Sequence, residues 1–110
     1  MEGFVRGDIV IVEFPFSNLQ TFKRRPVLVL KVPRGDDVIV AQMTGSSYEP
    51  SVEELIGSND FNSGGLKREG FVRIDKVASI EKFLIKYKAG SIKREKLNKI
   101  LDKICSFLRS

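Results

Sequence analysis

Hydrophobic residues in the first half of the chain come in short β-branched runs separated by polar or glycine-containing breaks. The runs at residues 7–14, 26–32 and 37–43 predict three strands, and residues 15–23 predict a polar loop between the first two. The break at 33–36 contains a proline and a glycine, which are typical of a tight turn. The second and third strands are therefore predicted to form a hairpin.

The first two runs carry apolar residues on both of their faces. In the first run, Val10 and Val12 share one face, whereas Ile9 and Ile11 share the other. In the second run, positions 27–30 are all apolar. A strand with one solvated face alternates apolar and polar residues, so these two strands are expected to be buried on both sides for part of their length.

The second half of the chain contains shorter and less regular runs. We expect short strands at residues 52–56 and 71–74, with scattered apolar positions continuing the second of these to Ile80. Residues 57–70 carry four glycines and predict a long irregular loop or a short helical turn. A last strand is predicted at 83–87, ended by the dipeptide Ala89-Gly90.

From about residue 93 to residue 108 the apolar period changes to that of a helix. An apolar stripe at this spacing predicts an amphipathic helix docked on the sheet. The stripe consists of Leu97, Ile100, Leu101, Ile104 and Leu108. Lys96, Lys99 and Lys103 occupy the opposite face, which we expect to be solvated. Ser91 is the nearest residue of a type that caps helices.

Many short strands, no internal repeat and one closing helix predict a mainly β protein. The expected fold is a small SH3-like barrel with a C-terminal amphipathic helix, and an OB-type barrel is the main competitor. The length of 110 residues suits a single domain spanning residues 1–110.

Composition narrows the chemistry. The chain has no histidine and only one cysteine, which excludes an intrachain disulfide and leaves no ordinary ligand set for a metal. We therefore expect no metal and no cofactor. No apolar run approaches the ~20 residues of a membrane span, and the N-terminus lacks a secretory pattern, so a cytoplasmic protein without a membrane partner is expected.

Positive charge is concentrated near the C-terminus. Residues 82–110 hold nine basic and two acidic side chains, a net charge of +7, although the whole chain has a net charge of +5. An excess of this kind indicates an anionic partner, such as nucleic acid or an acidic protein. It is equally consistent with a solvated, lysine-rich helix face.

An arginine pair stands at the mouth of the second predicted strand. Pro26 restricts the preceding Arg25 to extended conformations, which helps to fix the direction of its guanidinium. Guanidinium geometry matches two phosphate oxygens at once, so Arg24 and Arg25 are candidates for binding phosphate. The alternative interpretation is a solvated pair at a strand entrance.

Two further groups could carry chemistry. Residues 44–47 offer three hydroxyls and a glycine directly after a strand, where they could bind a phosphate or form a simple turn. Arg73 and Asp75 lie two apart on a strand and so leave the same face, as an ion pair or as an electrophile and a base. The adjacent carboxylates at 36–37 and 53–54 point to opposite faces and do not form a two-metal site.

Taken in order, these segments resemble the MazF/PemK family, the toxin ribonucleases of toxin–antitoxin pairs. The likeness covers nearly the whole chain. It runs through Arg6-Gly7-Asp8-Ile9-Val10 and Phe14, Arg25-Pro26-Val27-Leu28-Val29-Leu30, Ala41-Gln42-Met43-Thr44-Gly45-Ser46, Gly65-Leu66-Lys67, Val72-Arg73-Ile74-Asp75-Lys76-Val77 with Ile80, and Gly90-Ser91-Ile92. The chain departs from the family pattern in the loop before Arg25, which lacks a histidine used there by some members, and at Gly70, where many relatives have serine.

The resemblance implies an SH3-like barrel that forms a homodimer and acts as a metal-independent endoribonuclease on single-stranded RNA. It also implies inhibition by a cognate antitoxin with an acidic segment. The matching catalytic residues are Arg25, Thr44, Arg73 and Asp75. Nearby polar residues are expected to bind substrate, namely Arg24, Gln42, Ser46, Ser47 and Gln20.

Such an enzyme would use the 2′-hydroxyl of RNA as its nucleophile and leave a 2′,3′-cyclic phosphate and a 5′-hydroxyl. Asp75 is the natural base, provided that partial burial raises its pKa. Arg25 would clamp the phosphate, and Thr44 would donate a hydrogen bond to it. Three alternatives stay open: a gyrase-poisoning toxin on the same fold, a non-catalytic RNA-binding barrel, and a degenerate toxin that only binds its antitoxin.

Overall fold

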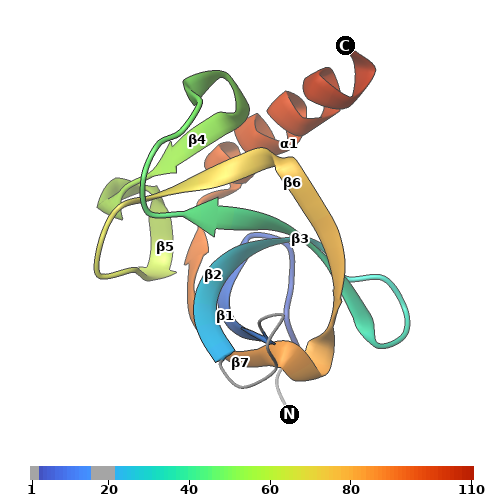
Figure 1. Cartoon of the computed structure of the whole chain (residues 1–110). Helices are drawn as coiled ribbons and strands as arrows, with labels where there is room; N and C mark the ends of the chain where they lie inside the picture. Colours follow the sequence, from blue (N-terminus) through green and yellow to red (C-terminus); the bar gives the residue numbers. More distant parts are fainter. Residues whose placement is uncertain (1–2, 16–21) are drawn as a thin grey trace.

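The computed structural model describes residues 3–15 and 22–110. Its strands form one strongly curled antiparallel sheet with the order β4-β6-β3-β2-β1-β7-β5 (Figure 1). The strands are β1 (Asp8–Pro15), β2 (Phe22–Lys31), β3 (Asp37–Thr44), β4 (Glu53–Ile56), β5 (Phe61–Gly64), β6 (Gly70–Glu81) and β7 (Ile85–Ile92). Helix α1 spans Arg94–Arg109, and three 3-10 turns lie at Pro50–Val52, Ser58–Asp60 and Lys82–Leu84. The predicted mainly β class with a C-terminal helix is confirmed, as a curled half-barrel.

Two hydrophobic clusters lie on opposite faces of the central strands. Val10, Val12, Val27 and Val29 belong to the cluster inside the curl. The alternate residues of β1 and β2 belong to the other cluster, together with the buried side of α1: Ile9, Leu28, Leu30, Leu97, Ile100 and Ile104. The prediction that the first two strands are buried on both sides is therefore confirmed.

The glycine-rich second half is more regular than its sequence predicts. Strand β5 lies inside the segment expected to be irregular, and it pairs with β7. Strand β7 continues through Gly90 to Ile92, so the strand end predicted at Ala89-Gly90 is wrong. A side chain at Gly90 would lie 2.6 Å from the Ser63 carbonyl oxygen, so the two strands can approach this closely only because Gly90 has no Cβ. Strand β2 also starts before Pro26, inside the predicted loop.

Gly7 and Asp8 fix the start of β1 in the fold. Gly7 has a φ of +93°, which favours glycine. The Asp8 carboxylate is buried and accepts hydrogen bonds from the Val5 amide, at 2.9 Å, and from the Ser91 hydroxyl, at 2.7 Å. These bonds hold the start of β1 against the end of β7. Ser91, the residue that the sequence offered as a cap for α1, therefore uses its hydroxyl to bind Asp8 instead.

Helix α1 docks mainly through its first three turns. Leu97, Ile100 and Ile104 are buried as the stripe predicts, but Leu108 is 70% exposed, because the last turn extends past the sheet (Figure 1). The N-cap residue is Lys93, and its own side chain makes no capping hydrogen bond. In the part of the chain that the structure describes, no helix has the length and apolar character needed to cross a membrane.

The lysine face of α1 is only partly the solvated surface that we expected, since Lys99 is exposed but Lys96 is not. Glu54 of β4 is buried, and it accepts hydrogen bonds from Lys96 at 2.8 Å and from Lys103 at 3.0 Å, while Lys99 lies 3.3 Å away. Burial raises the pKa of Glu54, but the lysine hydrogen bonds outweigh it and lower that pKa to about 2. Sequence periodicity gave the wrong result because β4, 42 to 49 residues away along the chain, packs beside this face.

Candidate functional site

The row of valines inside the curl ends in polar side chains. On β2, Arg25 precedes Val27 and Val29 at the same alternating positions, and its side chain leaves from the same face. On β3, Gln42 and Thr44 continue the row in the same way after Val38 and Val40. Val27 lies directly opposite Gln42, and continuing this register by two residues brings Arg25 opposite Thr44.

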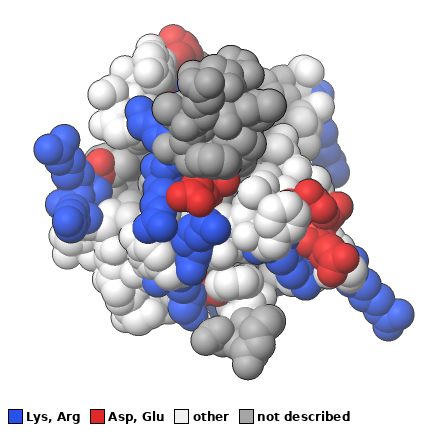
Figure 2. All heavy atoms as spheres, turned by 60° about the horizontal axis from the view of Figure 1, so that its bottom comes forward, with Lys and Arg blue, Asp and Glu red and all other residues white. Residues whose placement is uncertain are grey.

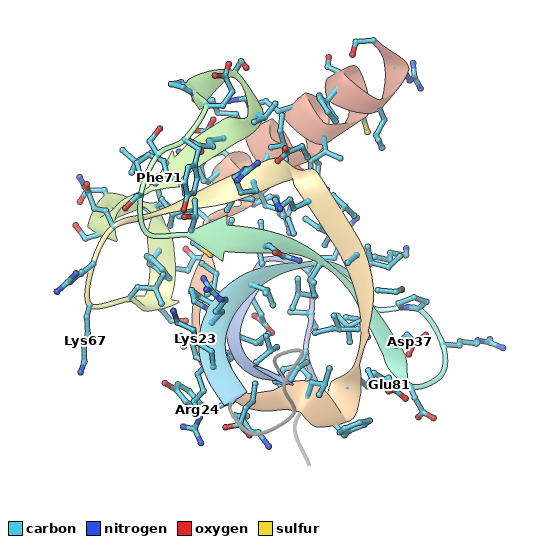
Figure 3. The ribbon with its side chains drawn as sticks, viewed as in Figure 1. Lys23, Arg24, Asp37, Lys67, Phe71 and Glu81 are labelled. Atoms are coloured by element: carbon cyan, nitrogen blue, oxygen red, sulfur yellow. The ribbon has the colours of Figure 1, made fainter. Side chains whose placement is uncertain are left out.

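Arg25 and Thr44 line one hollow of about 280 Å³. The loop between β5 and β6 forms its other wall and contributes Lys67, Arg68 and Glu69. Figure 3 shows Lys67 extending from this loop on the same side of the molecule as the start of β2. With three cations and one carboxylate in its lining, the hollow suits an anionic ligand.

Arg24 points to the opposite face of β2 from Arg25. Its Nε lies 3.3 Å from the Glu13 carboxylate, which also lies 3.5 Å from the Lys86 ammonium. Figure 2 shows basic side chains gathered with acidic ones on the face that includes the bottom of Figure 1. Because Arg24 pairs with Glu13 on the other face of β2, it does not line the hollow. The predicted substrate-binding residue Gln20 lies outside the described residues.

The predicted pair on β6 is present. The Arg73 guanidinium donates to both oxygens of Asp75, at 2.9 and 2.8 Å. This hydrogen bonding raises the pKa of Arg73 and lowers the pKa of Asp75, which is the opposite of the raised value that a carboxylate base would need. The condition set for Asp75 as the base, a pKa raised by partial burial, is not met in this structure, because the cation beside Asp75 outweighs its slight burial.

Strand pairing connects this ion pair to the hollow. Thr44 lies opposite Phe71, and Arg73 follows Phe71 on the same face of β6. Arg73 in turn lies opposite Glu53 of β4. Figure 3 shows Phe71 near the end of β6 that pairs with β4. One face of β2, β3 and β6 therefore carries all four predicted catalytic residues, with Glu53 of β4 beside Arg73.

The hydroxyls after β3 are engaged in local hydrogen bonds. The Thr44 hydroxyl donates to the Ser46 carbonyl at 3.1 Å, a turn that holds Ser46 beside it. The Ser47 hydroxyl donates to Glu53 at 2.7 Å, and the same carboxylate accepts the amide of Tyr48 at 2.8 Å. These bonds lower the pKa of Glu53, led by the one from Ser47, so Glu53 anchors the loop as an anion.

Sequence reasoning assigned no role to Lys67, Arg68, Glu53 or Tyr48. The first two are a basic pair inside a glycine-rich loop, which is a visible signal. Glu53 was considered only as a metal ligand. Within residues 3–15 and 22–110, no group of three or more histidine, cysteine, aspartate or glutamate side chains could hold a metal ion. Metal independence stays a prediction.

The family model described as "PemK-like, MazF-like toxin of type II toxin-antitoxin system" matches residues 5–108. The match covers nearly the whole chain and confirms the resemblance inferred from its motifs. A search of curated proteins gave no match.

Solved structures share the fold. A mycobacterial endoribonuclease in complex with its cognate antitoxin is 16% identical with a TM-score of 0.76, over 96% of this chain and 95% of that chain. The Mycobacterium tuberculosis toxin MazF-mt6 is 19% identical with a TM-score of 0.71, over 90% and 93%. MazF in the MazE-MazF complex of Deinococcus radiodurans is 19% identical with a TM-score of 0.76, over 94% of each chain.

Proposed function

Because the chain belongs to the PemK-like, MazF-like toxins of type II toxin–antitoxin systems, we propose that it cleaves single-stranded RNA without a metal ion. The family is one of endoribonucleases, so its membership classes the chain as an enzyme of this kind. The observation that carries the proposal is the hollow shared by Arg25 and Thr44, with Lys67 and Arg68 on its wall. Such a lining suits the phosphate backbone of RNA.

In the proposed reaction, the 2′-hydroxyl of RNA attacks the adjacent phosphorus and the 5′-oxygen of the next nucleotide leaves. Arg25 binds the phosphate oxygens and stabilises the negative charge that develops on them. Thr44 exchanges its bond with the Ser46 carbonyl for one to a phosphate oxygen. The leaving 5′-oxygen takes a proton from water, so the products are a 2′,3′-cyclic phosphate and a 5′-hydroxyl.

Arg73 and Asp75 take part through their ion pair. A phosphate that binds Arg73 competes with the carboxylate for the guanidinium and frees Asp75 to accept the proton of the 2′-hydroxyl. Because pairing with Arg73 lowers the pKa of Asp75, the paired carboxylate is a poor base, and exchange of this pair is a step of the mechanism. Gln42, Ser46 and Ser47 contact the nucleotides on either side.

The proposal includes two protein contacts and a cytoplasmic location. The chain forms a homodimer with its grooves near the subunit interface, and a cognate antitoxin presents an acidic segment to the cationic face. Two structural relatives support the antitoxin contact, since one is an endoribonuclease with its cognate antitoxin and the other is a MazE-MazF complex. RNA and the acidic segment then compete for Arg25 and Arg73.

The test is incubation of the purified protein with a long single-stranded RNA in excess EDTA, followed by analysis of the new ends. We expect cleavage with 2′,3′-cyclic phosphate and 5′-hydroxyl termini. A requirement for added magnesium would refute metal independence. Intact RNA with and without magnesium, from protein that still binds an acidic antitoxin peptide, would identify a degenerate toxin instead.

A further inference from the structure

Tyr48 is a large aromatic side chain held in solvent by a fixed backbone. Its side chain is 72% exposed. Its amide donates to the buried Glu53 carboxylate at 2.8 Å, and the neighbouring amide of Glu49 donates to the same carboxylate at 3.2 Å. Since Ser47 also donates to Glu53, three successive residues are tied to one buried anion. The ring is therefore presented at a defined position, although it is not packed into the core.

The Tyr48 ring lies against the predicted catalytic ion pair. The centre of the Arg73 guanidinium is 5.7 Å from the ring centroid, within the range of a cation–π contact. Asp75 accepts hydrogen bonds from one edge of that guanidinium, Nε and Nη2, at 2.9 and 2.8 Å, which fixes the cation under the ring. Tyr48 thus adjoins the face that carries Arg25 and Thr44.

We propose that Tyr48 is a stacking platform for an unpaired base of the RNA beside the scissile phosphate. The proposal rests on the proposed function, because it names a subsite of the same groove. Aromatic rings bind single-stranded nucleic acid by stacking on base faces, and a neighbouring arginine strengthens such a site. A phosphate taken by Arg73 places the attached nucleoside within reach of the adjacent ring.

Exposure alone does not single out Tyr48. Phe83 is 71% exposed and Tyr87 is 52% exposed, but both lie at or near β7, and neither has a cation–π contact with a described arginine or lysine. Among the side chains that the structure describes, Tyr48 is the exposed aromatic residue that combines an anchored loop with a fixed cation. Phe83 therefore serves as the matched control.

The chain offers a direct optical probe of this site, because it contains two tyrosines and no tryptophan. In a Tyr87→Phe variant, Tyr48 is the only tyrosine. We would titrate this variant in EDTA with a short 2′-O-methyl oligoribonucleotide, which lacks the attacking hydroxyl. We expect saturable quenching of tyrosine emission, and no quenching by inorganic tripolyphosphate at equal ionic strength. Equal quenching by tripolyphosphate, or none by the oligonucleotide at saturation, would overturn the platform.

Side-chain shape gives an independent test. Tyr48→Phe should keep oligonucleotide affinity, whereas Tyr48→Leu, which keeps apolar volume without a π face, should weaken it by about 5- to 100-fold. In cleavage assays the loss should appear mainly in KM. Phe83→Ala should change neither value. Equal affinity for the leucine and phenylalanine variants would refute stacking.

These results separate the platform from catalysis. Quenching without cleavage supports the platform and refutes the enzyme, while cleavage with an unchanged KM in Tyr48→Leu refutes the platform alone. Sedimentation of each variant identifies a third outcome. If Tyr48→Leu loses affinity only because it dissociates an oligomer that Tyr48→Phe preserves, the ring is a protein contact and the proposal fails.

Discussion

Two groups of basic side chains on this molecule differ in what faces them. In the helix lysine cluster, Lys96, Lys99 and Lys103 converge on Glu54 within 3.3 Å. In the hollow, Arg25, Lys67 and Arg68 share a cavity. None of these three has an ion pair with a carboxylate in residues 3–15 and 22–110. The first group stabilises the fold, and the second is free to bind an external anion.

The comparison shows that a charge count along the sequence does not locate a binding surface. The C-terminal excess includes the helix lysine cluster, whose charge is partly balanced by a carboxylate from β4. The residues predicted to bind phosphate come from a region with no net basic excess. What matters is whether folding brings a counter-charge to each cation, because a carboxylate beside a cation offsets its attraction for another anion.

The largest expected effect is on catalysis at the hollow. Arg25→Ala should lower single-turnover cleavage by at least about 100-fold, as expected on loss of one transition-state donor. Arg25 is exposed, so the melting temperature should stay near that of the wild type. Arg34→Ala removes an exposed arginine from the β2–β3 turn and should cleave normally. An Arg25→Ala protein that cuts as fast as the wild type would refute the role.

The next effect is on stability at the helix lysine cluster. Glu54→Gln removes the anion that the three lysines share, and we expect a loss of about 2 kcal/mol in the free energy of unfolding. This value allows for solvent screening, since the side chain of Lys99 is 63% exposed. Urea unfolding measures it, with the exposed Glu81→Gln as the control. The folded variant should cleave RNA at the wild-type rate, and a large catalytic loss would mean that the two groups are coupled.

The same cluster predicts a pH dependence. The pKa of Glu54 is lowered from an ordinary value of 4.5 to about 2 in the folded state, so its contribution is complete above pH 4.5 and is lost as the pH falls from 4.5 towards 2. The stability difference between the wild type and Glu54→Gln should therefore be constant near neutral pH and shrink below pH 4.5. Urea titrations at several pH values test this, and a difference that grew on acidification would contradict the ion cluster.

The smallest effect is on the salt dependence of RNA binding. Lys67→Gln combined with Arg68→Gln should weaken binding of a non-cleavable oligonucleotide several-fold. It should also reduce the slope of log affinity against log salt by about 1.4, since each contact to a single strand contributes about 0.7. Lys99→Gln should leave the slope unchanged. The reverse pattern would assign RNA binding to α1.

The central strands could be predicted from the sequence because their signals are local. Apolar residues on both faces of β1 and the unbroken apolar run in β2 indicate burial on two faces, and Val10 and Ile9 lie in opposite clusters. Strand β5 gave no such signal. Its sequence, Phe61-Asn62-Ser63-Gly64, has little β propensity, and it becomes a strand because Gly64 and Gly90 let it lie close against β7.

The candidate site likewise has features that the sequence predicts and features that only the fold reveals. The strand periodicity correctly put Arg73 and Asp75 on one face, where they form an ion pair. Other features depend on side chains that folding brings together, and no local sequence pattern indicates them. These are the lowered pKa of Asp75 and the position of Glu54 beside the helix lysines. Glu53 was missed for the same reason, since it acts through the amides of the preceding loop. The roles of the predicted catalytic residues stay predictions.

We expect RNA to bind the hollow and its adjoining face, and the helix lysine cluster to take no part in binding. The most direct measurement is an amide and arginine side-chain NMR titration of the labelled protein with a 2′-O-methyl oligoribonucleotide in EDTA. We expect shifts at the Arg25 Nε–H, at Thr44 and at Arg73, with the amides of residues 96–103 unchanged. Shifts confined to α1 and β4, with Arg25 and Thr44 silent at saturation, would contradict this expectation.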